Sequence, residues 1–251
     1  MWVLTLTCGI AFGVAFGLTG VGSVFAVPLL VYALGLAPHR AVCVAMVAVS
    51  SLSALTTALR WRGGAIEFRA GAVVAAMGIA GAPAGAWIGR FFSGKWLMLL
   101  FACFVVVISL RMLIRGGEPA MPGSRALAGK GAHRLALAVA GLMTGILAGL
   151  LGIGGLLIVP TLVLLAGVEI HRAIATSLPI IFAISLSAIS SHFLAGQRVP
   201  LVATALFVAG GALGMIVGGR LGKRLSERRL QTVFALAMLA IAAFILARNL
   251  A

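Results

Sequence analysis

Uncharged apolar stretches of membrane-spanning length are the feature that most constrains this chain. The stretches 41–59, 70–89, 199–219 and 230–247 contain no charge, and each approaches the roughly 20 residues that a helix needs to cross a bilayer. Two further stretches, 96–114 and 173–197, carry one ionisable residue each, Arg111 and His192. Two longer stretches, 2–38 and 135–168, exceed one simple span. The sequence therefore predicts an all-α, polytopic helical membrane protein.

Composition excludes an ordinary soluble domain. Only 9% of the residues are charged, whereas a soluble domain carries about 25%. The net charge of +15 comes from Lys and Arg placed between the apolar stretches, where they orient insertion, so we expect no nucleic acid among the partners. The three cysteines have no metal-ligand or disulfide spacing, and we expect no metal and no cofactor. The N-terminus lacks the pattern of a cleaved signal peptide.

An internal repeat divides the chain into two related halves. A constant offset aligns Gly, His, Arg and Pro positions of the first half with identical residues of the second, such as Gly9 with Gly141, Pro28 with Pro160 and His39 with His171. With a single insertion, the match continues from Gly81, Gly85 and Gly89 to Gly214, Gly218 and Gly222. The sequence predicts a tandem duplication within one membrane domain. Its parts are repeat 1 (1–114), a Gly- and Pro-rich linker (115–134) and repeat 2 (135–251).

The distribution of positive charge indicates whether the long first segment of each half crosses the membrane once or enters and leaves on the same side. If every segment crosses once, the 19 Lys and Arg residues divide almost evenly between the two sides. If each long segment enters and leaves on one side, the division becomes strongly uneven, as membrane proteins require. Each repeat then consists of a Gly-broken re-entrant hairpin, or a tight helix pair, followed by three transmembrane helices. The halves are inverted relative to each other, and both termini are expected in the periplasm.

Two glycine-rich breaks are the candidate substrate site. They span 17–23 and 149–155, and the residues singled out there are Gly20, Gly22, Ser23, Gly152, Gly154 and Gly155. A broken helix leaves backbone N–H groups unpaired, which hydrocarbon tolerates only where a polar partner reaches them. Helix N-termini restarting near Val24 and Leu156 would attract an anion. The alternative is that these glycines only permit close helix packing, the role we favour for Gly81, Gly85, Gly89, Gly214, Gly218 and Gly222.

Hydroxyl groups on the span after each break are candidate ligands for an oxyanion: Ser50, Ser51, Ser53, Ser177 and Ser185. The alternative for each is a hydrogen bond to a carbonyl of its own helix. His39 and His171 stand at matched positions and are candidates for coupling or gating, with helix capping as the alternative. Pro179 is either a gate or a packing kink. The chain has no Asp, and its four Glu lie in predicted loops, which favours an anionic substrate over a cation.

The two Gly-rich runs, each followed by Pro and an HRA-type stretch, resemble those of the sulfite exporter TauE/SafE family over nearly the whole chain. The second half has the cleaner pattern, while the first has Ser23 where the family usually repeats glycine. The resemblance implies transport of sulfite or an organosulfonate across a bacterial inner membrane.

The predicted function is therefore secondary transport of a small sulfur-containing anion by alternating access. A passive anion channel is the main alternative, because the same broken helices and hydroxyls could line a pore. A non-transport membrane subunit and an intramembrane enzyme are further alternatives, and we expect no enzyme. The expected partners are the lipid bilayer and the anion, and a homo-oligomer stays open.

Overall fold

A computed structural model of the chain describes residues 2–19, 22–60, 68–114, 130–153, 155, 157–194, 196–197, 199–222 and 227–250. Every regular element in these ranges is helical. The helices are α1 (Trp2–Thr19), α2 (Ser23–Pro28), the π-helix η1 (Leu29–Ala33), α3 (Pro38–Arg60), α4 (Phe68–Gly89), α5 (Gly94–Ile114), α6 (Lys130–Leu151), α7 (Ile158–Leu164), α8 (Ile170–Leu194), α9 (Leu201–Gly222) and α10 (Glu227–Leu250).

Seven of the described helices are long and apolar enough to cross a membrane: α3, α4, α5, α6, α8, α9 and α10. Their outward surfaces are apolar, and Trp2, Trp87, Phe91 and Trp96 are largely exposed near one end of the bundle. Water would not favour such a surface, whereas lipid does, and aromatic rings collect where hydrocarbon meets headgroups. The prediction of a polytopic helical membrane protein is confirmed.

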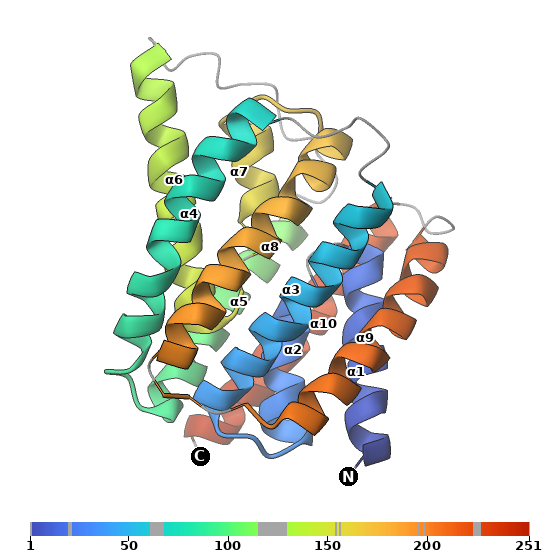
Figure 1. Cartoon of the computed structure of the whole chain (residues 1–251). Coiled ribbons are helices and arrows are strands. Elements are labelled where there is room, and N and C mark those ends of the chain that lie inside the picture. The colour runs from blue at the N-terminus through green and yellow to red at the C-terminus, as the bar shows by residue number, and fades with distance from the viewer. Residues whose placement is uncertain are drawn as a thin grey trace.

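Each half opens with a hairpin of one long and one short arm. In the first half α1 ascends from the N-terminus in Figure 1, and α2 with η1 returns toward the same end. The short arm contains six residues in α2 and five in η1, so it is about 17 Å long and cannot cross the hydrocarbon alone. In the second half, α6 is followed by the seven-residue α7 in the same way. The predicted re-entrant hairpins are present.

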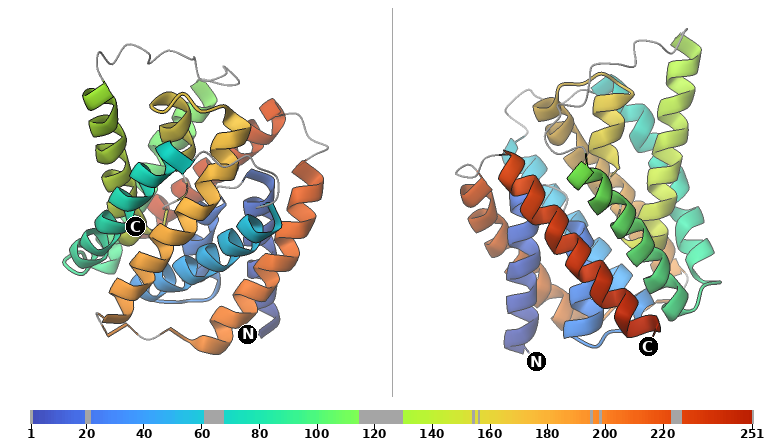
Figure 2. Two further views of the ribbon diagram at one scale, coloured as in Figure 1. Left: turned by 45° about the horizontal axis from the view of Figure 1, so that its top comes forward. Right: turned by 180° about the vertical axis from the view of Figure 1, so that it is seen from behind.

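The two halves run in opposite directions and pack across each other. α1 ascends and α6 descends in Figure 1, and α3 and α8 likewise run antiparallel. The first helix of each half packs against the third long helix of the other, which gives the pairs α1–α9 and α4–α6. α3 packs against α8 in the centre, and α5 packs against α10, as the rear view in Figure 2 shows. This exchange is the arrangement expected of inverted repeats.

Glycines form the close contacts between exchanged helices. A Cβ atom on Gly13 would meet the carbonyl oxygen of Gly211, and one on Gly145 would meet that of Gly78. The packing role predicted for Gly81, Gly85, Gly214 and Gly218 is confirmed, because a Cβ on each would strike backbone of the neighbouring helix. Gly89 contacts the Leu150 side chain instead, and the surroundings of Gly222 lie outside the described residues.

Both termini lie at one end of the bundle, and the short loops 34–37 and 90–93 lie at that end as well (Figures 1 and 2). Arg40, Arg90, Lys95 and Arg248 stand at the helix ends there. Arg111, Arg172 and Arg220 stand at helix ends of the opposite side. These described Lys and Arg residues lie at the ends to which the hairpin model of the sequence assigns them. We call the end that bears the termini the terminal end.

Candidate functional site

The helix breaks are shorter than the sequence motifs that predicted them. Gly17 is still in α1, which ends at Thr19, and Gly149 is still in α6, which ends at Leu151. A Cβ atom on Gly17 would strike the backbone of Met215, and one on Gly149 that of Ala82. The first glycine of each motif is therefore a packing residue, which corrects the predicted extent of both breaks. We call the connection from α1 to α2 the first break and the connection from α6 to α7 the second break.

Backbone geometry at each break requires glycine. Gly152 has φ +77, a conformation that side chains of L residues rarely adopt, and a Cβ there would lie 3.0 Å from Val27. Gly22 turns the chain back so tightly that a Cβ would strike the backbone of Ala15 and Phe16. Gly20 and Gly154, which the sequence also assigned to the site, lie outside the described residues. The short helices restart at Ser23 and Ile158.

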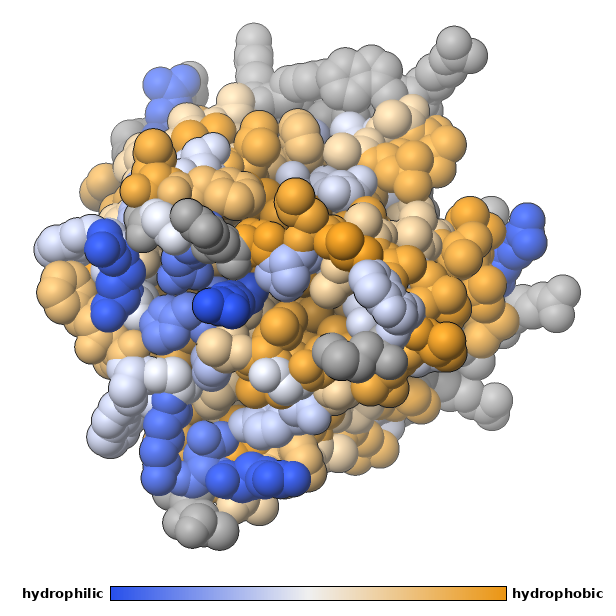
Figure 3. Space-filling view, turned by 60° about the horizontal axis from the view of Figure 1, so that its bottom comes forward, coloured by the Kyte–Doolittle hydropathy of each residue, from blue (hydrophilic) through white to orange (hydrophobic). Residues whose placement is uncertain are grey.

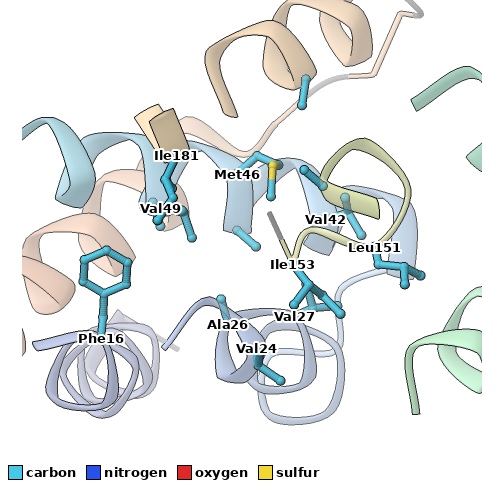
Figure 4. Packing of buried hydrophobic residues seen from close by; sticks show 14 of the residues in the cluster. Phe16, Val24, Ala26, Val27, Val42, Met46, Val49, Leu151, Ile153 and Ile181 are labelled. Carbon is cyan, nitrogen blue, oxygen red and sulfur yellow. The ribbon is translucent and has the colours of Figure 1, made fainter. Parts of the chain in front are cut away.

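The two breaks meet in space although they belong to different halves of the chain. A Cβ atom on Gly155 would lie 3.8 Å from the Ser23 hydroxyl oxygen and 3.0 Å from Cδ1 of Ile181 on α8. Figure 4 shows the same junction from close by, with Val27 of α2 beside Ile153 of the second break. Met46 of α3 points toward these residues from the other side. Residues of both halves therefore enclose one junction.

Buried hydroxyl groups without a partner come from the elements that meet here. The hydroxyl oxygens of Ser23, Ser53, Thr57 and Ser185 are buried and have no hydrogen-bond partner within the described part of the chain. Ser53 and Ser185 are fully buried and match each other in the repeat. Ser53 of α3 and Ser185 of α8 lie on the two central helices that pack against each other, and Ser185 lies one helical turn from Ile181. The start of α2 and both central helices thus each supply an unpaired hydroxyl.

Other hydroxyls named by the sequence are already paired with their own helices. Ser51 donates to the Val47 carbonyl over 2.9 Å, and Ser177 donates to the Ile174 carbonyl over 2.9 Å. For these two serines, the structure shows the alternative to ligand binding, which is a hydrogen bond to a carbonyl of their own helix. Ser50 is buried on α3. The structure therefore singles out Ser23, Ser53 and Ser185 from the larger set of candidate ligands.

The matched histidines stand at helix starts. Nε2 of His39 lies 3.1 Å from the carbonyl oxygen of Gly89, the last residue of α4, and must carry a proton because a carbonyl only accepts. This bond pairs a helix-end carbonyl, in keeping with the capping alternative. The side chain of His171 lies outside the described residues. Pro179 lies within α8, where its ring leaves the Ala175 carbonyl without a helical donor.

Sequence reasoning did not place His192 at the site. Its Nε2 lies 3.1 Å from the carbonyl oxygen of Gly149, in the last turn of α6 just before the second break. The last carbonyls of a helix lack intrahelical donors, so His192 stabilises the end that the break creates. The side chain is 5% exposed, and its Nδ1 has no partner among the described residues. The sequence signal that could have identified it is that His192 is the one ionisable residue in the apolar stretch 173–197.

Apolar side chains close the junction in this conformation. Ala26, Val27, Met46 and Ile153 are at most 1% exposed, and external water does not reach them. Figure 4 shows these side chains pointing toward one another between α2, α3 and the second break. A solute could reach Ser23 only after the surrounding helices move. The Ser23 hydroxyl is therefore a buried polar group inside an apolar bundle.

Comparison with known proteins identifies the family to which this chain belongs. The model of the family described as "Sulfite exporter TauE/SafE" matches residues 5–245. A "Probable membrane transporter protein" of Xylella fastidiosa strain Temecula1 is 31% identical over 98% of this chain and 95% of its own length, and that of strain 9a5c is also 31% identical. The protein named "Probable membrane transporter protein YunE" of Bacillus subtilis is 28% identical over 66% of this chain. No solved structure matches. The chain belongs to the sulfite exporter TauE/SafE family of membrane transporters.

Proposed function

We propose that this protein is a secondary transporter that carries a small sulfur-containing anion, sulfite or an organosulfonate, across the inner membrane by alternating access. The observation that carries the proposal is the unpaired hydroxyl of Ser23 at the junction of the two inverted hairpins. The central helices α3 and α8, which pack against each other, add the unpaired, fully buried hydroxyls of Ser53 and Ser185. A buried polar group without a partner costs about 1–3 kcal/mol. A bound oxyanion would accept a hydrogen bond from each of these groups.

Hydroxyl groups suit a substrate that must also leave. They donate hydrogen bonds to sulfite or sulfonate oxygens without the strong attraction of a buried ion pair. The chain contains no Asp, and the described Glu169 lies in the loop before α8, outside the spans. A buried carboxylate that would repel an anion or bind Na⁺ is therefore not among the described residues of the junction. Membership in the family supports the sulfur-containing class and supports transport over catalysis.

The closed junction and the inverted halves support alternating access. The junction is sealed in this conformation, so binding requires a rearrangement of the surrounding helices. Because the halves are inverted, the same motion performed by the other half would open the junction to the opposite side. The terminal end is assigned to the periplasm, since most Lys and Arg lie at the other end and mark the cytoplasmic side.

Counterflow tests the proposal. The purified protein is reconstituted in liposomes loaded with unlabelled sulfite, and uptake of radiolabelled sulfite is followed with sulfoacetate, sulfate and chloride as competitors. A carrier accumulates label transiently and is stimulated by internal sulfite, and we expect sulfoacetate to compete better than chloride. Flux that internal sulfite does not stimulate would identify a passive channel. Liposomes that remain impermeable to every anion would contradict transport and favour a subunit role.

A further inference from the structure

An open cavity lies at the terminal end, away from the junction. Its volume is about 310 Å³, large enough for a small organic anion. Tyr32 of η1, Lys95 of α5 and Arg248 and Asn249 of α10 provide its polar lining, and Val31 and Pro38 contribute apolar surface. Figure 3 views this end of the molecule and shows hydrophilic side chains gathered over part of a largely hydrophobic face.

Among the described residues, the Tyr32 hydroxyl accepts a hydrogen bond and has no acceptor for its own O–H. Nδ2 of Asn249 lies 2.7 Å from the Tyr32 hydroxyl oxygen and 2.8 Å from the Ile245 carbonyl oxygen. Because a carbonyl only accepts, the shared atom must be the amide nitrogen, and it donates to both oxygens. Tyr32 therefore accepts from Asn249 and still has its own O–H to donate. An edge-on contact with Phe244, at 5.2 Å between ring centroids, holds the Tyr32 ring in place.

Two cations line this cavity, and none of its described lining residues is an acid. The chain has no Asp, and the lining residues include Lys95 and Arg248 but no Glu. Lys95 and Arg248 are exposed, and Gly94, the first residue of the long helix α5, also lines the cavity. The N-terminus of a long helix adds a partial positive charge. Two positive charges, an O–H donor and an open cavity of suitable size thus coincide.

We propose that this cavity is a loading site, which binds a small oxyanion of the sulfonate or sulfite class before it moves to the junction. This inference rests on the proposed function. The short arm connects the two places, because Tyr32 lies nine positions after Ser23 along α2 and η1. That separation corresponds to about 13 Å along a helix axis. An anion at Tyr32 would therefore be held at the outer end of the arm whose inner end lies in the junction.

The repeat makes the site one-sided. The alignment of the two halves pairs Lys95 with Arg228 and Arg115 with Arg248, so the sequence supplies two cations to each end. Tyr32 and Asn249 correspond to Leu164 and Gly116, which cannot form the same pair. The repeat thus duplicates the positive charge but not the Tyr32–Asn249 pair. We therefore expect anion recognition to be stronger at the terminal end than at the other.

The test measures anion attraction without relying on transport. Val31→Cys is placed in a chain whose native Cys8, Cys43 and Cys103 are replaced, and the protein is studied in nanodiscs of zwitterionic lipid. Its labelling rate is measured with 2-sulfonatoethyl methanethiosulfonate and with the cationic trimethylammonium analogue. We expect Lys95→Gln with Arg248→Gln to lower the anionic-to-cationic rate ratio roughly tenfold. Arg40→Gln with Arg90→Gln removes the same charge from the same end, outside the cavity, and should leave the ratio nearly unchanged.

Protection experiments identify the source of the anion. Millimolar sulfoacetate should slow labelling in zwitterionic nanodiscs, and Tyr32→Phe should weaken this protection severalfold. A phosphate headgroup has the same charge chemistry, so nanodiscs with phosphatidylglycerol form the second arm. Protection by phosphatidylglycerol with none by sulfoacetate would make the cavity a lipid site and overturn the proposal. An unchanged rate ratio in the Lys95 and Arg248 variant would also overturn it.

Counterflow separates this proposal from the function on which it rests. Sulfoacetate protection without counterflow would mean that the loading site stands and the transport function fails. Counterflow without protection by sulfoacetate would support the transport function and overturn the loading site. If both hold, Lys95→Gln with Arg248→Gln should raise the KM for uptake from the terminal side severalfold and leave the maximal exchange rate close to that of the native protein.

Discussion

The hydroxyl oxygen of Ser23 lies 3.8 Å from the position that a Cβ atom on Gly155 would occupy. Ser23 begins the short arm of the first hairpin, and Gly155 lies in the break of the second. Their proximity places the two breaks at one junction. Under the proposed function, a side chain added at Gly155 would therefore compete with an anion bound at Ser23.

Gly155→Ala should reduce sulfite counterflow severalfold, and Gly155→Val should reduce it further, with a smaller effect on thermal stability. The added methyl would face Cδ1 of Ile181 at 3.0 Å, and this flexible side-chain end can shift. The Ser23 hydroxyl would nevertheless lose part of its open space. Gly219→Ala is the control, because its Cβ would come no nearer than 4.0 Å to Gly17. Equal counterflow in both alanine variants would remove Gly155 from the site.

Ser53→Ala and Ser185→Ala should separate stability from function. Each substitution removes a buried hydroxyl without a partner in the described part of the chain, so the free energy of unfolding should stay constant or rise by about 1 kcal/mol. Sulfite binding should weaken at the same time. Ser109→Ala is the matched control, because Ser109 is also fully buried but donates to the Val105 carbonyl over 2.8 Å. If Ser53→Ala and Ser185→Ala bind sulfite as well as Ser109→Ala does, the hydroxyls are not ligands.

Gly13→Ala and Gly145→Ala should each destabilise the fold by roughly 1–3 kcal/mol, because the new methyl has to displace backbone of the facing helix. The loss would appear as a lower midpoint in thermal unfolding, with the remaining folded protein still able to bind. Gly219→Ala again provides the comparison in a spanning helix. Unfolding midpoints that agree for all three variants would contradict the close helix contacts.

His192→Ala should destabilise the protein by about 1–3 kcal/mol, because it leaves the Gly149 carbonyl unpaired inside the bundle. His39→Ala removes a bond of the same length, 3.1 Å, to the Gly89 carbonyl at a less buried position, where water can replace it. The loss for His39→Ala should therefore be smaller. Chemical denaturation of both variants measures the difference, and the reverse order would show that His192 does not support the break.

Alkaline phosphatase, which is active only in the periplasm, can test the orientation. A fusion after Leu250 should be active, and fusions within 61–67 or 116–129 should be inactive, because those loops lie on the predicted cytoplasmic side. A green fluorescent protein fusion should give the opposite pattern. Activity of the phosphatase within 61–67 would reverse the assignment of the two sides.

Much of the fold was predictable because the sequence repeats. The spacing of Gly, Pro, His and Arg revealed two halves, and the charge distribution indicated hairpins whose arms return to one side. The extent of the breaks was not predictable, since Gly17 and Gly149 look like break residues although both pack against facing helices. A glycine pattern alone does not distinguish a turn from a close helix contact.

The choice among the candidate ligands also required the three-dimensional structure. Ser51 and Ser53 are close neighbours on α3, yet Ser51 donates to its own helix and Ser53 has no partner in the described part. Local sequence does not determine which rotamer a serine adopts. His192 and Gly149, and likewise Tyr32 and Asn249, are distant in sequence, so only the packing of the folded chain brings them together.

Accessibility of Ser23→Cys from both sides of the membrane is the sharpest test of whether the junction opens alternately around an anion. In a chain without its native cysteines, an impermeant sulfonate reagent is applied to one side at a time in oriented vesicles, with and without sulfoacetate. We expect slow labelling from each side and protection by sulfoacetate in both cases, because the junction should open alternately around its anion. Labelling from one side only, or labelling that sulfoacetate does not slow, would contradict it.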